Sequence, residues 1–209
     1  MTCGNVSLGQ IHIIHLTGVK AFLIECMGGT LLVDTGSSRN DAQRILRRIS
    51  EVGKKPSEIN ICIITHAHAR HIGGLPLLKE ICKFRVMAHE DESEKLREKT
   101  GVTSDVKLKG GEILPLCGGI RILHIPGHTR GSVMLYIPTF RALIAGDSLI
   151  GERGQLKLPP APSCYDFDLL KASIKRLEEL DFDIVFVSHG DDVLRGAKNR
   201  VLQLIREMI

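Results

Sequence analysis

Three histidines lie close together in residues 65–74 of the chain: His66, His68 and His71. The apolar segment before them, residues 59–64, has the length and the β-branched content of a buried strand. His66 and His68 are two residues apart, so on an extended backbone their side chains leave on the same face. Imidazoles that converge at the end of a strand suit a transition metal, with zinc as the first choice. The sequence therefore predicts a metal site at this strand end.

Further potential ligands follow other apolar segments in the same way. His128, Asp147 and His189 each come just after a predicted strand and next to a glycine. The ends of strands gather at one edge of a sheet, where α/β proteins commonly carry their sites. These side chains can therefore join the three histidines in a single site that is built from distant parts of the chain.

The elements that must position these residues are short strands and helices. We predict strands at residues 10–16, 21–26, 30–33, 59–64, 84–87, 106–108, 112–114, 120–124, 133–137, 142–145 and 183–187. We predict helices at residues 40–52, 75–82, 90–99, 169–180 and 197–208. Strand clusters separated by helices indicate sheets covered by helices, an α/β (α+β) class. No linker or repeat divides residues 1–209, so we expect one domain.

Two segments receive more specific predictions. Residues 90–99 carry charges of both signs, which favours an exposed helix. Residues 156–163 are rich in proline and are predicted to form a loop.

Composition narrows the choice of partners. The 209 residues are 43% hydrophobic and 25% charged, which is ordinary for a soluble globular protein. The net charge of +4 is small and spread along the chain, which argues against a nucleic-acid partner. No apolar segment approaches the ~18 residues of a membrane helix, so we expect no membrane partner. Residues 1–5 contain no basic segment before an apolar one, so we predict no secretory signal and a cytoplasmic location.

The six cysteines are scattered and form no CxxC pair. Most of them have apolar neighbours, as Cys62 does between two isoleucines. We therefore predict reduced, mostly buried thiols and no disulfide framework in a core of this size.

Five motifs resemble, in the same order, those of the metallo-β-lactamase superfamily. They are residues 33–36, 65–74, 126–129, 146–148 and 188–190, and they span most of the chain. Each motif alone is common, but the ordered set is specific. The resemblance implies a four-layer αββα sandwich, in which two sheets lie face to face with helices outside and metals at one edge.

The resemblance also implies roles for particular residues. It assigns His66, His68 and His128 to a first metal, and His71, His189 and a bridging Asp147 to a second. It makes Asp34 a residue that touches no metal and steadies the histidine segment.

The implied chemistry is hydrolysis. Three histidine ligands leave a fourth tetrahedral position open, which is typical of catalytic zinc. A water bound there has a pKa of ~7 and supplies a hydroxide nucleophile. We therefore expect cleavage of a small thioester, ester, lactone or amide. The subclasses that the chain resembles are hydroxyacylglutathione hydrolase (glyoxalase II) and small lactonases.

Arg70 departs from the family pattern, which usually has an aspartate ligand of the second metal there. A guanidinium offers only donors and cannot bind a cation. One interpretation is a single zinc ion, with Arg70 bound to Asp147 in place of the second ion and both residues active in catalysis. In the other, Arg70 points to solvent and a second metal binds weakly through Asp147, His71 and His189.

Two other functions stay open at this stage. His66, His128 and Asp147 match a two-histidine-one-carboxylate iron(II) site, as in the persulfide dioxygenases of the same superfamily. A non-catalytic relative that keeps the fold is the other alternative, although the histidine triad argues against it. Among the remaining histidines, we predict that His89 caps or packs and that His12 is structural.

Overall fold

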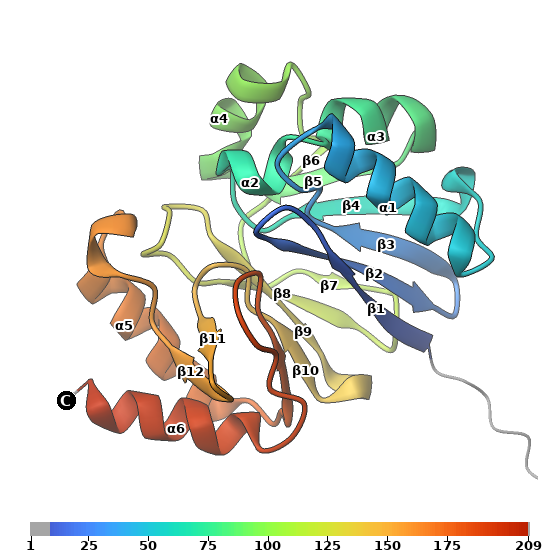
Figure 1. Cartoon of the computed structure of the whole chain (residues 1–209). Helices are drawn as coiled ribbons and strands as arrows, with labels where there is room; N and C mark the ends of the chain where they lie inside the picture. Colours follow the sequence, from blue (N-terminus) through green and yellow to red (C-terminus); the bar gives the residue numbers. More distant parts are fainter. Residues whose placement is uncertain (1–8, 209) are drawn as a thin grey trace, which may run out of the picture.

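Two β-sheets form the centre of the computed structural model, which describes residues 9–208 (Figure 1). The first sheet has six strands in the order β1-β2-β3-β4-β5-β6. They are β1 (Gly9–His15), β2 (Lys20–Cys26), β3 (Gly29–Val33), β4 (Ile59–Ile64), β5 (Arg85–His89) and β6 (Val106–Leu108). β1, β2 and β3 are antiparallel neighbours, whereas β3 to β6 are parallel. The carboxyl ends of β3, β4 and β5 therefore lie at one edge of the sheet.

The second sheet has five strands in the order β13-β10-β9-β8-β7. They are β7 (Ile113–Leu114), β8 (Ile120–His124), β9 (Val133–Ile137), β10 (Ala142–Ile144) and β13 (Ile184–Phe186). β8 and β10 are each antiparallel to β9, and β13 is parallel to β10. The carboxyl ends of β8, β10 and β13 therefore share one edge. His128, Asp147 and His189 follow these three strands in turn.

Helices cover the outer faces of both sheets (Figure 1). The helices are α1 (Arg39–Glu51), α2 (Ala69–Ile72), α3 (Leu75–Cys82), α4 (Glu90–Thr100), α5 (Phe167–Lys175) and α6 (Ala197–Glu207). Ile45 of α1 and Leu78 of α3 pack on the first sheet. Leu170 of α5 and Val201 of α6 pack on the second. The order helix, sheet, sheet, helix confirms the predicted αββα sandwich.

The space between the sheets is filled by apolar side chains from both. Phe22 and Val33 of the first sheet pack with Leu135 and Phe186 of the second. The next residue of β2, Leu23, points to the opposite face and joins the core beneath the helices. Both faces of this strand are therefore buried, which explains why its residues 21–24 are all apolar and do not alternate with polar ones.

The predicted strands and helices are found, with ends that differ by a few residues. No helix within residues 9–208 combines the length and the apolar character that crossing a membrane requires. Residues 1–5, on which the prediction about a signal segment depends, lie outside the described residues, and so does Cys3.

Helix α4 differs from its prediction as an exposed helix. Glu92, Ser93 and Leu96 are buried, and Leu96 packs in the core beneath the first sheet's helices. His89 caps the helix, because its side chain accepts a hydrogen bond from the backbone N–H of Asp91 at 3.2 Å. The charge pattern concealed the buried face because one of the buried residues is itself a carboxylate.

A hairpin of β11 (Ile150–Glu152) and β12 (Gln155–Lys157) replaces the start of the predicted proline-rich loop. It packs closely beside the segment that carries His189. A Cβ atom on Gly151 would lie 1.8 Å from the carbonyl oxygen of Asp191, so only glycine permits this approach. The hairpin therefore lies at the edge of the sandwich that carries the candidate ligands.

A disulfide joins Cys26 to Cys117, so the prediction that the cysteines are reduced is wrong for this pair. Cys26 ends β2 in the first sheet, and Cys117 lies between β7 and β8 of the second, at the ends of the sheets opposite the histidines. Their Cα atoms are 4.8 Å apart although they are 91 residues apart in sequence. Sequence spacing gave no sign of this pair, because only the packing of the sheets brings it together. Cys62 and Cys82 are free and buried, as predicted.

Candidate metal centre

The histidine segment continues directly from the end of β4. The backbone of His68 is extended, with φ −77° and ψ 146°, and α2 begins at the next residue. His66 and His68 therefore point to the same side, as the sequence predicts. The single turn of α2 then returns His71 toward them, so that the ring centroids of His66 and His71 are 4.1 Å apart.

Asp34 holds this segment from the end of β3. Its buried carboxylate accepts hydrogen bonds from the backbone N–H of Thr65 at 2.8 Å and from the hydroxyl of Thr65 at 2.7 Å. Its other contact is with Nδ1 of His71 at 2.7 Å. A carboxylate at Nδ1 fixes the orientation of the ring and leaves Nε2 to face the candidate site. The contacts expected of Asp34 are therefore present.

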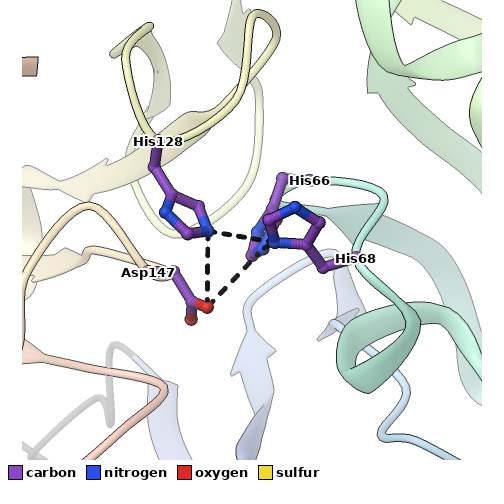
Figure 2. A group of neighbouring side chains, drawn as sticks. All are labelled: His66, His68, His128 and Asp147. Atoms are coloured by element: carbon purple, nitrogen blue, oxygen red, sulfur yellow. Dashed lines mark hydrogen bonds and ion pairs between the residues drawn. The ribbon is translucent and has the colours of Figure 1, made fainter. Parts of the chain in front are cut away.

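Three imidazoles and one carboxylate meet in front of this segment (Figure 2). Nδ1 of His68 lies 3.1 Å from Nε2 of His66 and 3.1 Å from Nε2 of His128. Oδ2 of Asp147 lies 3.6 Å from each of the same two Nε2 atoms. We call these four residues the first donor group.

A second donor group shares its carboxylate with the first. Oδ1 of Asp147 lies 3.2 Å from Nε2 of His71, and Oδ2 of Asp147 lies 3.3 Å from Nε2 of His189. Asp147 therefore stands between the two groups, in the position of a bridging ligand. The structure brings together all six residues that the sequence suggested as ligands.

The spacing of the first donor group fits a metal ion. Ligand atoms at ~2.0–2.1 Å from a tetrahedral zinc lie roughly 3.3–3.4 Å from one another. The observed separations of 3.1 and 3.6 Å fall on either side of this value. Imidazole nitrogens with one carboxylate oxygen are also donors that divalent transition metals accept.

Two buried atoms without hydrogen bonds support the same conclusion. Nε2 of His71 and Oδ1 of Asp147 are shielded from solvent, and neither makes a hydrogen bond despite their proximity. Buried polar atoms without a partner are rare in folded proteins. The two atoms therefore require either a proton shared between them or a metal ion that binds both.

The acid-base properties of the first donor group suit a cation. Burial holds the pKa of His66 well below its usual value, lowers that of His68, and lowers that of His128 to about 4. Burial alone would raise the pKa of Asp147, but the histidines that contact it outweigh this effect and keep the pKa well below its usual range. At neutral pH the group therefore offers three neutral imidazoles and a carboxylate.

His71 behaves differently from these three histidines. Its burial lowers its pKa, but the charge of Asp34 and the contact with Asp147 outweigh burial and raise the pKa to about 10. His71 is thus protonated between two carboxylates at neutral pH. A metal at the second donor group would have to displace this proton.

Two pockets reach the donor groups. The larger, of about 680 Å³, opens over both groups, and beyond the ligands its wall includes the apolar residues Ile150, Pro159 and Pro160. The smaller, of about 490 Å³, lies between α4 and the segment around Tyr165. Both are lined by His68, so a bound molecule can extend from the site in two directions.

Arg70 lies at the wall of the larger pocket with an exposed side chain. Within residues 9–208, the ionic contacts of Asp147 are all with histidines, so the predicted contact between Arg70 and Asp147 is absent. The structure matches the alternative, in which Arg70 faces solvent. The reason is that four histidines already surround the carboxylate of Asp147, which leaves the guanidinium of Arg70 in solvent at the pocket wall.

Other histidines have structural positions. Nε2 of His12 pairs with Oε1 of Glu25 at 2.5 Å, and His89 caps α4, in agreement with the predictions for both. The ring of His124 stacks on that of His89, with centroids 4.0 Å apart, and contacts the carbonyl oxygen of Arg130 at 2.9 Å. Each of these three histidines therefore has a partner within the protein.

Comparison with known proteins gives a consistent result. Residues 16–189 match the family model of the metallo-beta-lactamase superfamily. An N-acyl homoserine lactonase from a Bacillus species is 28% identical in an alignment that covers 86% of this chain and 84% of that protein. A hydroxyacylglutathione hydrolase from Rhodopseudomonas palustris (strain BisB5) is 29% identical over 125 residues, which cover 58% of this chain and 47% of that protein.

Solved structures share the fold. A metallo-beta-lactamase family protein from Thermus thermophilus superposes with a TM-score of 0.74 at 20% identity, covering 97% of this chain and 80% of that one. The metallo-beta-lactamase GOB-18 from Elizabethkingia meningoseptica has a TM-score of 0.74 at 21% identity, covering 95% of this chain and 86% of that one.

Proposed function

The chain belongs to the metallo-β-lactamase superfamily, and from that premise we propose that it is a zinc-dependent hydrolase of small lactones, esters or thioesters. One observation carries the proposal: three neutral imidazoles and a carboxylate lie at tetrahedral spacing and open onto a pocket. His66, His68 and His128 would hold the metal, with Asp147 beside it. The lactonase relative, which aligns over most of its length, supports an acyl substrate.

The metal, when bound, would polarise the attacked carbonyl group and lower the pKa of a water to ~7. The protein supplies the orientation of the reacting groups. Asp147 stays ionised beside the histidines, so its carboxylate can accept a hydrogen bond from the attacking water and orient it. Pro159 and Pro160 contribute apolar surface to the pocket wall. Arg70 at the wall can bind a carboxylate on the substrate.

The structure offers a reason to prefer hydrolysis over the iron oxygenase. An iron(II) site of that kind uses two histidines and one carboxylate and leaves the remaining positions to other ligands. Here His68 lies as close to His66 as it does to His128, so a third imidazole belongs to the same group. Three histidine ligands are typical of catalytic zinc.

Turnover on a small panel of substrates tests the proposal. Acylated lactones and simple thioesters are incubated with the purified protein, and acid release is followed by a pH indicator. We expect hydrolysis of at least one class, its loss after treatment with a chelator, and its recovery with zinc. Hydrolysis that survives complete metal removal, or oxygen consumption in place of hydrolysis, would contradict the proposal.

The identity of residue 70 is expected to control the number of metal ions. We propose about one zinc ion per chain in the wild type, because the second donor group has no carboxylate at this position and His71 must lose a proton. Arg70→Asp supplies the missing oxygen donor and should raise the content to about two ions by elemental analysis. Arg70→Ala, which removes the charge but adds no donor, is the control and should hold less than Arg70→Asp. Two tightly bound ions in the wild type would refute this expectation.

A further inference from the structure

A buried carboxylate on α4 contacts both of the segments that carry the first donor group. Glu92 is only 2% exposed. Its Oε2 accepts a hydrogen bond from the backbone N–H of Ala67 at 2.8 Å, and its Oε1 accepts one from the backbone N–H of Gly131 at 3.1 Å. Glu92 is not a member of either donor group. It contacts the backbone that carries the ligands.

The first contact fixes the residue between two ligands. Ala67 lies between His66 and His68 and is fully buried. Its N–H is bound by Glu92, and its carbonyl oxygen accepts a hydrogen bond from Nζ of Lys99 at 3.0 Å. Glu92 and Lys99 both belong to α4, so this helix holds the peptide groups on both sides of Ala67.

The second contact fixes the segment of His128. Gly131 is three residues beyond this ligand, in the connection between β8 and β9. A Cβ atom at Gly131 would lie 2.8 Å from Cγ of Glu92 and 2.8 Å from Nδ1 of His89. Only glycine therefore lets the backbone approach the carboxylate so closely.

These contacts join two parts of the molecule that different sheets supply. His66 and His68 follow a strand of the first sheet, whereas His128 follows a strand of the second. Both oxygens of Glu92 are satisfied by backbone donors, and within residues 9–208 no lysine, arginine or histidine forms an ion pair with it. Its position in the first turn of α4 also favours a negative charge there.

We propose that Glu92 is a positioning residue that sets the distance between the paired ligands of the first sheet and His128 of the second. Each oxygen of the carboxylate accepts a hydrogen bond from one of the two segments, so the carboxylate fixes the distance between them. Glutamine retains the shape but presents an N–H₂ group to one of the two N–H donors. It should therefore release one segment and weaken metal binding.

The inference depends on the proposed metal site and not on the proposed reaction, so it is tested without substrate. The affinity for Co²⁺ is measured by competition with a chelator, and the visible absorption of bound Co²⁺ reports the coordination geometry. Glu92→Gln should lower the affinity on the order of 10–100-fold, as loss of a residue that supports the ligands typically does. Its Co²⁺ spectrum should also differ from that of the wild type.

Glu90→Gln is the matched control, because it removes an exposed carboxylate from the same first turn of α4. It should leave both affinity and spectrum unchanged. Wild-type affinity and spectrum in Glu92→Gln would overturn the inference alone. Absence of Co²⁺ binding in the wild type would overturn the metal site and the inference with it. If Glu92→Gln does not fold, Gly131→Ala is the second variant. Its added methyl group would push the backbone N–H of residue 131 away from Oε1 of Glu92, so it must weaken Co²⁺ binding.

Discussion

His128→Ala is expected to abolish metal binding at the first donor group and to lower kcat/KM by roughly three orders of magnitude or more. The substitution removes one of three imidazoles that would hold the metal, and Nε2 of this residue is 3.1 Å from the ligand atom of His68. Loss of the ion removes its stabilisation of charge in the transition state, which amounts to several kcal/mol. Elemental analysis and turnover on the substrate that the panel identifies measure the two effects.

The variant is expected to remain folded, because His128 lies in a connection at the edge of the sandwich and not in an apolar core cluster. Circular dichroism checks this point. His15→Ala, which removes an exposed histidine from β1, is the control and should retain metal and activity. Full activity in a metal-free His128→Ala protein would exclude the proposed hydrolase mechanism.

Breaking the disulfide is expected to lower the free energy of unfolding by about 4–5 kcal/mol. The bond closes a loop between residues that are 91 positions apart, and the chain-entropy model assigns a stabilisation of this size to loops of that length. Chemical denaturation of the double variant Cys26→Ser/Cys117→Ser, beside the oxidised wild type, measures the difference.

Reductant provides the internal control for this experiment. It should destabilise the wild type to the level of the double variant and leave the double variant unaffected. Cys164→Ser, which replaces a free and partly exposed thiol, should be as stable as the wild type. Equal stability of the oxidised and reduced wild type would show that the bond does not contribute.

The sequence was sufficient for the fold and for the six residues that meet at the donor edge, because local patterns mark the strand ends and the ordered motifs resemble those of a known family. Apolar segments that end in a histidine or an aspartate beside a glycine mark the strand ends. The ordered motifs then specify which ends belong together. Residues 59–64 and residues 75–82 illustrate this, since the predicted strand and helix coincide with β4 and α3.

The features that the sequence did not reveal depend on contacts between distant elements. The partner of Cys26 is apparent only when the two sheets face each other. The exposed position of Arg70 follows from the four histidines that surround Asp147, an arrangement that only the folded chain creates. Glu92 resembled its charged neighbours in sequence, and only the packing of α4 against two ligand segments distinguishes it. Thr65 was missed for a similar reason, although a hydroxyl next to the first histidine was a signal that could have found it.

The disulfide also bears on how the sandwich fluctuates. It joins the two sheets at the end remote from the histidines. We therefore expect any transient separation of the sheets to be smallest near the disulfide and largest at the edge where the donor groups lie. Backbone amides near the donor groups should then exchange hydrogen faster than those near Cys26 and Cys117. A metal whose ligands come from both sheets would hold the two sheets together at the edge where the donor groups lie. Catalytic competence and resistance to local opening would then depend on the same ion.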